Sequence, residues 1–122
     1  MTKQKAKIIE YLCSVTSHPT AETIYKAIKN EIPTISLATV YRNLNQMSED
    51  GTILKLEVNG EFRFDGNVND HIHIVDKDGI IYDEFDTQIF NQIKNSSKML
   101  NYNIKNIKIL IKGNKKDIST QN

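Results

Sequence analysis

Cysteine is nearly absent from this sequence, because Cys13 is the only one among 122 residues. A single cysteine cannot form a disulfide within the chain, and it cannot build a four-cysteine zinc site. No apolar run approaches the roughly 20 residues that span a bilayer. The first dozen residues also lack the long apolar segment and cleavage site of a signal peptide. We therefore expect a cytoplasmic protein with no membrane partner.

Histidine is also scarce, and each of the three that occur lies in a short motif that a metal sensor would need. His18 begins HPTAETIYK, whereas His71 and His73 belong to NDHIHIVD. Two aspartates flank this pair, Asp65 in FRFDG and Asp83 in GIIYDEF. Imidazole nitrogens and carboxylate oxygens suit divalent ions such as Mn²⁺, Fe²⁺ or Zn²⁺. These five side chains are the candidate metal ligands.

The overall composition is that of a globular protein, with 39% apolar and 25% charged residues. A chain of 122 residues holds one ordinary domain or two very small ones. The formal net charge of +1 neither supports nor excludes nucleic-acid binding, because DNA responds to the local placement of charge.

Hydrophobic periodicity predicts three helices in the first half of the chain. Residues 5–14 carry Ile8 and Leu12 at helical spacing, and Cys13 on the same face is predicted to be a buried core residue. A second helix follows Thr20, its predicted N-cap, and ends near residue 30. The third covers residues 37–49, with Ser36 as N-cap and an Asp-Gly pair as its stop signal.

Two alternating runs follow, residues 53–58 and 61–65, and Asn59-Gly60 joins them. Asn-Gly between such runs is a strong hairpin signal. Three helices followed by a hairpin form a winged helix-turn-helix, so residues 1–65 are predicted to be a DNA-binding domain.

The third predicted helix has one apolar face and one small, polar face. The polar face suits a DNA major groove, where arginine reads guanine and asparagine reads adenine. The hairpin adds Lys55, with Arg63 as a further candidate for a phosphate contact. The candidate DNA contacts are Ser36, Ala38, Thr39, Tyr41, Arg42, Asn45 and Lys55.

The second half begins with a polar stretch, residues 66–70, that predicts a hinge. Strands are expected at residues 71–76 and 80–85, a helix at 89–100 and a last strand at 104–111. Residues 71–112 thus form a β-β-α-β unit, and 113–122 are predicted to be a flexible tail. Such a small unit buries little core alone, so we expect a homodimer. The predicted fold class is α+β.

Four segments together resemble the ferric uptake regulator (Fur) family: HPTAETIYKAI, IPTISLATVYRNLNQM, GEFRFD and DHIHIVDKDGIIYDEF. The resemblance runs from about residue 5 to residue 111. Within the family, the peroxide-sensing repressors (PerR) bind a regulatory ion through three histidines and two aspartates. The matching positions are His18, Asp65, His71, His73 and Asp83.

The resemblance implies a metal-dependent, peroxide-responsive repressor that binds palindromic operator DNA as a homodimer, and not an enzyme. Its regulatory ion would be Fe²⁺ or Mn²⁺, although Zn²⁺ also suits the donors. Asp at position 83 favours the peroxide-sensing branch. In that branch, iron-catalysed oxidation of a ligating histidine, His18 or His71, would release the DNA.

The predicted topology agrees with such a site. Residues two apart on a strand share a face, so His71 and His73 can converge on one ion. Asp83 lies on the next strand, across a turn. His18 comes from the DNA-binding half, so a bound ion would fix the angle between the two halves and act as a switch.

One departure from the family concerns zinc. Members commonly carry paired C-x-x-C motifs that hold a structural zinc, whereas this chain has VDKDG at 75–79 and KGNK at 112–115. We therefore expect no structural Cys₄ zinc. Three alternatives remain: a metal-uptake regulator without peroxide sensing, a metal-independent DNA-binding protein, and an iron oxygenase with two histidines and one carboxylate.

Overall fold

The computed structural model describes residues 1–86 and 88–116. The chain divides into two compact units, Met1–Val68 and Asn69–Asn122, and each contains its own β-sheet. The division falls within the five residues expected to be a hinge. The functional limits of the two domains stay predictions.

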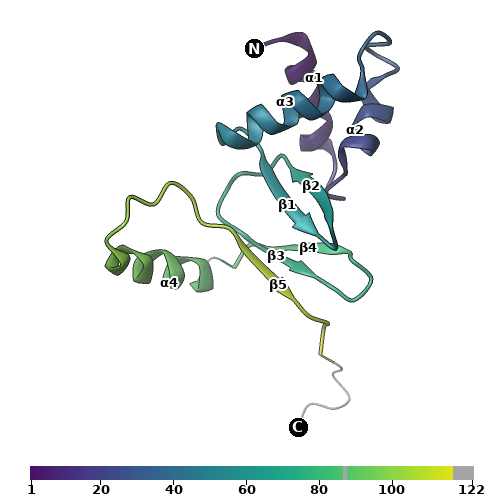
Figure 1. The fold of residues 1–122 in the computed structure, drawn as a ribbon. Helices are drawn as coiled ribbons and strands as arrows, with labels where there is room; N and C mark the ends of the chain where they lie inside the picture. The colour runs from purple at the N-terminus through teal and green to yellow at the C-terminus, as the bar shows by residue number, and fades with distance from the viewer. Residues whose placement is uncertain (87, 117–122) are drawn as a thin grey trace. The chain divides into compact units, whose positions relative to one another are not determined.

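Three helices open the first unit, as predicted (Figure 1): α1 (Lys3–Ser14), α2 (Ala21–Ile28) and α3 (Leu37–Glu49). Each begins at a hydroxyl N-cap that accepts a backbone N–H three residues on, namely Thr2, Thr20 and Ser36. Such caps satisfy N–H groups that have no partner inside the helix. Because Thr2 provides a cap, α1 begins two residues earlier than expected.

The wing is a two-stranded antiparallel sheet of β1 (Leu54–Val58) and β2 (Glu61–Asp65). Asn59 and Gly60 form its turn, with φ angles of 52° and 81°. A two-residue turn with both φ angles positive matches the twist of the strands. The predicted winged helix-turn-helix is therefore confirmed.

The core of the first unit lies between the three helices and β2. Val40, Leu44 and Met47 of α3 are buried along one face, as the periodicity predicted. The wing contributes Phe64, the largest of the fully buried side chains, which is 1% exposed. Packing against this core fixes the orientation of α3 and of β2.

The second unit is the predicted β-β-α-β arrangement. Its elements are β3 (Ile72–Val75), β4 (Ile81–Glu84), α4 (Gln88–Ser97), a 3₁₀ turn η1 (Lys98–Leu100) and β5 (Ile109–Lys112). The sheet order is β4-β3-β5, in which β3 pairs antiparallel with β4 and parallel with β5. β3 is thus the central strand (Figure 1).

Three expectations differ from the structure. Cys13 is exposed, because it is about 100° around α1 from the buried Leu12 and lies beyond the apolar face. The last strand is shorter than residues 104–111, since β3 offers only four residues for pairing. The predicted tail begins with Gly113 and Asn114, which bond to the β3 segment, whereas residues 117–122 lie outside the described part of the chain.

The turn between β3 and β4 is organised by hydrogen bonds to the side chain of Asp76. Asp76 Oδ1 accepts the backbone N–H groups of Asp78 at 2.8 Å and Ile80 at 3.0 Å. The chain after β5 is joined to the same turn, because Gly113 N donates to Val75 O and Lys77 N donates to Asn114 Oδ1. These hydrogen bonds connect the two segments.

We predict that Asp76→Ala lowers the free energy of unfolding by about 1–2 kcal/mol, because two turn N–H groups lose a charged acceptor. Thermal unfolding of the variant checks this value. Asp78→Ala, at the exposed tip of the same turn, is the matched control and should change stability by less than about 0.5 kcal/mol. Equal effects of the two substitutions on stability would contradict the role of Asp76 as the acceptor that stabilises the turn.

Candidate functional site

The second unit brings His71, His73 and Asp83 together at one end of its sheet. His73 on β3 is the direct cross-strand partner of Asp83 on β4, and His71 immediately precedes β3. The Nε2 atoms of the two histidines lie 3.0 Å apart. Asp83 Oδ1 lies 3.4 Å from His71 Nε2 and 3.5 Å from His73 Nε2. Three candidate ligand atoms therefore converge.

The orientation of His71 is set by its neighbours. Its Nδ1 lies 2.6 Å from the carbonyl oxygen of Asn69. Because a carbonyl only accepts, Nδ1 carries the proton and the neutral ring keeps its lone pair on Nε2. The ring also stacks on Phe85, with centroids 5.1 Å apart. A backbone carbonyl is one of the partners, with carboxylates and water, to which metal-ligating histidines usually donate their second ring N–H.

The spacing of the three atoms fits a divalent ion. Bonds of about 2.0–2.2 Å to nitrogen and oxygen place neighbouring ligand atoms about 2.8–3.6 Å apart at tetrahedral or octahedral angles. All three separations in the second unit fall in this interval. Two histidines and one carboxylate on one side of an ion leave further positions open for other ligands.

The first unit holds the other two predicted ligands next to each other. His18 Nε2 lies 3.3 Å from Asp65 Oδ2, the ligand spacing seen in the second unit. The other oxygen of Asp65 accepts the backbone N–H of Asn67 at 2.9 Å, which orients the carboxylate. His18 has a φ of 52°, a left-handed conformation that costs a residue with a side chain about 1–2 kcal/mol. Strain of this kind is frequent at functional sites.

Arg63 was a candidate phosphate contact, which stays a prediction, and the structure shows that its guanidinium binds the loop before α2. Its Nε donates to the carbonyl oxygen of His18, and its Nη2 donates to that of Ser17 at 3.1 Å. Sequence reasoning missed this role. Strand periodicity places Arg63 and Asp65 on one face, but it gives no signal for a contact with the loop at Ser17 and His18.

The predicted DNA-facing side of α3 is accessible. Ala38, Arg42, Asn45 and Gln46 are exposed, and Thr39 is half-buried. Ser36 and Thr39 also form the N-cap, since Ser36 Oγ accepts the Thr39 backbone N–H at 3.1 Å. Their roles as DNA contacts stay predictions.

Two contacts of α3 were not foreseen from the sequence. Lys55 Nζ donates to Asn45 Oδ1 at 3.2 Å and lies 4.0 Å from the ring centroid of Phe62, which joins the wing to the helix. Asn43 is only 5% exposed and donates to Gln4 Oε1 at 3.4 Å. Its polarity gave no sign that it belongs to the buried face of α3.

Tyr41 contacts α2 through its hydroxyl, which donates to Glu22 Oε1 at 2.5 Å. This hydrogen bond is the main reason why the pKa of the Glu22 carboxyl is lowered. The same bond, with a smaller contribution from burial, raises the pKa of the Tyr41 hydroxyl. The contact positions Tyr41 at the margin of the predicted DNA-facing side.

We predict that Tyr41→Phe lowers the free energy of unfolding at neutral pH by less than about 1 kcal/mol, because the bond is exposed. A lowered pKa of Glu22 stabilises the fold above the carboxyl's ordinary pKa of about 4.3, and this stability is lost as pH falls through the lowered value. A raised pKa of Tyr41 stabilises the fold below about 10, and this stability is lost as pH rises through the raised value.

The decrease in the free energy of unfolding caused by Tyr41→Phe should therefore be largest between about pH 5 and pH 9 and smaller outside that window. Urea unfolding of both proteins at pH 3.5 and pH 7 measures it, with Tyr25→Phe as the control on α2. A loss that does not depend on pH would contradict this interpretation.

The fold and the ligand groups together define a class of protein: a winged-helix unit followed by a small α/β unit, with histidine and aspartate donors in both. The chain belongs to the ferric uptake regulator family, whose model matches residues 1–112. The resemblance inferred from the sequence is thereby confirmed. The single cysteine is also consistent with the absence of a cysteine-bound structural zinc.

Relatives support the peroxide-repressor branch. The peroxide operon regulator of Bacillus subtilis is 41% identical over 76 residues, which are 62% of this chain and 52% of that protein. The peroxide-responsive repressor PerR of Staphylococcus epidermidis is 41% identical over 85 residues, 68% of this chain and 57% of that protein. The chain thus spans about half the length of the curated relatives it matches. These relatives are named as regulators and not as enzymes.

Solved structures agree with the fold. The Campylobacter jejuni peroxide stress regulator has a TM-score of 0.78 and 30% identity, and the match covers 93% of this chain and 87% of that one. The ferric uptake regulator from Pseudomonas aeruginosa with manganese has a TM-score of 0.77 and 26% identity, covering 96% and 90%. Among the described residues, no helix is both long and apolar enough to cross a membrane.

Proposed function

We propose that this protein is a metal-dependent, peroxide-responsive transcriptional repressor that binds palindromic operator DNA as a homodimer. The observation that carries the proposal is the convergence of His71, His73 and Asp83 within 3.0–3.5 Å of one another in a chain that also contains a winged helix. Membership of the ferric uptake regulator family supports the same function.

The regulatory site combines both ligand groups. His18 and Asp65 supply one nitrogen and one oxygen from the first unit, and the second unit supplies two nitrogens and one oxygen. Three histidines and two carboxylates suit Fe²⁺ or Mn²⁺, and Zn²⁺ is a further candidate. One ion held by both units fixes the angle of the winged helix, so metal binding selects the DNA-binding conformation.

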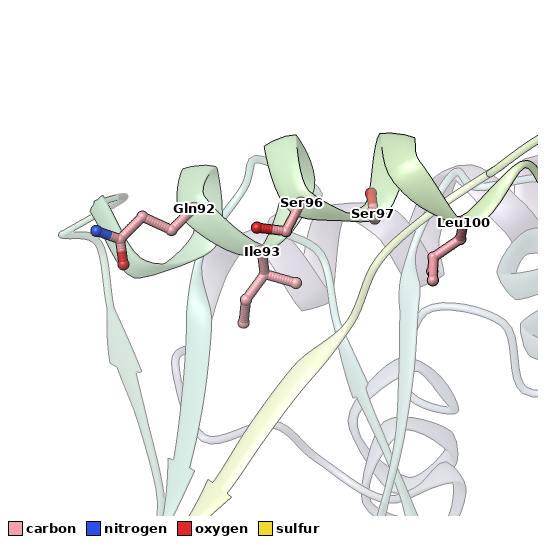
Figure 2. Close-up of a pocket in the computed structure, with 5 residues that line it drawn as sticks. All are labelled: Gln92, Ile93, Ser96, Ser97 and Leu100. Carbon is pink, nitrogen blue, oxygen red and sulfur yellow. The ribbon is translucent and has the colours of Figure 1, made fainter.

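The second unit supplies the dimer contact. Phe90 is the only buried residue of α4 among those described, whereas seven neighbouring apolar side chains are exposed: Phe85, Ile89, Ile93, Met99, Leu100, Tyr102 and Ile104. A hollow of about 350 Å³ lies along α4 and is lined by Gln92, Ile93, Ser96, Ser97 and Leu100 (Figure 2). A surface this apolar is stabilised by a second copy. The two recognition helices then read the half-sites of a palindrome.

Peroxide sensing rests on which ion occupies the site. His18, Asp65, His71, His73 and Asp83 would hold the ion, and Fe²⁺ there would supply peroxide-activating chemistry. The net reaction would add one oxygen atom from hydrogen peroxide to a ligating imidazole ring and release water. The chain's own part is to hold His18 and His71 as ligands, so oxidation of either ring removes a ligand. Mn²⁺ in the same site supports DNA binding without this oxidation.

Mass spectrometry tests the proposal most directly. Protein loaded anaerobically with Fe²⁺ is treated with low hydrogen peroxide, and Mn²⁺-loaded protein serves as the control. We expect one added oxygen on the peptide that contains His18 or the one that contains His71, in the iron sample only. DNA affinity should fall in parallel.

The other outcomes separate the alternatives. Metal-dependent DNA binding without histidine oxidation would identify a metal-uptake regulator of the same family. If the protein binds no metal and its DNA affinity does not depend on added metal, it is a metal-independent regulator.

A further inference from the structure

The loop before α2 is attached to the wing through its backbone. Three consecutive carbonyl oxygens, those of Ser17, His18 and Pro19, accept hydrogen bonds from β2. Arg63 supplies two of these bonds from its guanidinium, to Ser17 at 3.1 Å and to His18. The backbone N–H of Phe64 supplies the third, to Pro19 at 3.0 Å. The loop is thus held at every residue from 17 to 19.

The central residue of this loop needs such support. His18 has a φ of 52°, a region that residues with a side chain rarely adopt. Pro19 follows it, and proline restricts the conformation of the preceding residue. Local sequence preferences therefore act against the conformation that His18 has, and contacts from β2 must maintain it.

The geometry of the contact specifies arginine. Nε and Nη2 lie on one edge of the planar guanidinium, so they can donate in parallel to two neighbouring carbonyls. A lysine ammonium has no such fixed pair of donors. Glu61 contacts the other side of the group, with Oε1 4.0 Å from Nη1. The two hydrogen bonds to the loop, which we call the fork, therefore use Nε and Nη2 of Arg63, whereas the ion pair with Glu61 uses Nη1.

The strand that holds the loop also carries a candidate ligand. Arg63 and Asp65 are two residues apart on β2 and lie on the same face. Asp65 Oδ2 lies 3.3 Å from His18 Nε2. Fixing the loop on β2 therefore fixes the separation of these two side chains before a metal binds.

We propose that Arg63 is a positioning residue, which holds His18 in its left-handed conformation and so prepares the ligand pair of the first unit for the metal. This inference rests on the proposed function, because it assigns a purpose to the pair. It also gives the wing a second role in addition to DNA contact.

Two variants and one control test the proposal. Arg63→Gln removes the fork and the charge, Arg63→Lys keeps the charge without the fork, and Glu61→Gln removes only the ion pair. Mn²⁺ affinity is measured from the electron paramagnetic resonance signal of free Mn²⁺. The conformation of His18 in metal-free protein is measured from its ¹³Cα and ¹³Cβ chemical shifts.

For Arg63→Gln we expect Mn²⁺ affinity to fall by about 10–100-fold, the range found when a group that orients a metal ligand is removed. Arg63→Lys should lose nearly as much, and Glu61→Gln should match the unmodified protein. In both arginine variants the His18 shifts should move away from left-handed values. A merely electrostatic role would instead leave Arg63→Lys unchanged.

Two results would overturn the inference: unchanged His18 shifts in the variants, or unchanged Mn²⁺ affinity. If Arg63→Gln fails to fold, Arg63→Lys decides the question. If the unmodified protein binds no Mn²⁺, the proposed function fails and the metal role of Arg63 fails with it. The shifts then show separately whether Arg63 holds the loop.

Discussion

His73→Ala should reduce Mn²⁺ affinity by at least about 100-fold, or about 2.7 kcal/mol, and should abolish the metal-dependent gain in DNA affinity. His73 lies in the central strand of the second unit, opposite Asp83. Its Nε2 atom lies 3.0 Å from the Nε2 atom of His71. Removing a group that hydrogen-bonds to a metal ligand already lowers metal affinity by about 10–100-fold. Losing the ligand itself removes a bond to the ion, so the effect should be larger.

The experiment measures DNA affinity by fluorescence anisotropy with and without Mn²⁺, and circular dichroism verifies that the variant is folded. Because His73 is buried, His73→Gln is a second variant that preserves most of the volume. Asp78→Asn, in the turn between the same two strands, is the matched control and should bind Mn²⁺ normally. Metal-dependent DNA binding retained by both His73 variants would exclude this group as the regulatory site.

Phe64→Ala should lower the free energy of unfolding of the first unit by about 3–5 kcal/mol. The Phe64 ring is 1% exposed and lies in the core between β2 and the three helices. Its removal leaves a cavity that the close-packed surroundings fill only in part. Total stabilities of natural domains are about 5–15 kcal/mol, so a loss of this size brings the winged helix close to unfolding.

Phe62→Ala provides a control on the same strand. Phe62 is 47% exposed, and its ring contacts the side chain of Lys55. Removing it should lower the free energy of unfolding by less than about 1 kcal/mol. Urea unfolding followed by far-ultraviolet circular dichroism compares the two variants. A loss of less than about 1 kcal/mol for Phe64→Ala would contradict the assigned core.

The comparison of Phe62 with Phe64 shows a limit of sequence patterns. The two residues are two positions apart on β2, so strand periodicity assigns them to one face. Only Phe64 is buried, because the helices cover that end of the hairpin. Asn43 shows the converse case, because it is a polar residue that is buried by the packing of α3.

The candidate metal groups differ in how far the sequence predicts them. His71, His73 and Asp83 are separated by a strand period and a short turn, so local rules alone bring them together. His18 and Asp65 are far apart in the sequence, and the family resemblance rather than periodicity connected them. The Arg63 contacts with Ser17 and His18 could not be predicted by either route.

The sequence by itself determined the elements of this protein. Helix caps at Thr20 and Ser36 and the turn at Asn59-Gly60 follow from interactions between residues at most four positions apart. The tertiary structure alone decided that Asn43 is buried, that Phe62 is exposed, and how the loop at His18 is held. These features depend on segments that meet only after folding, and local rules contain no information about such contacts.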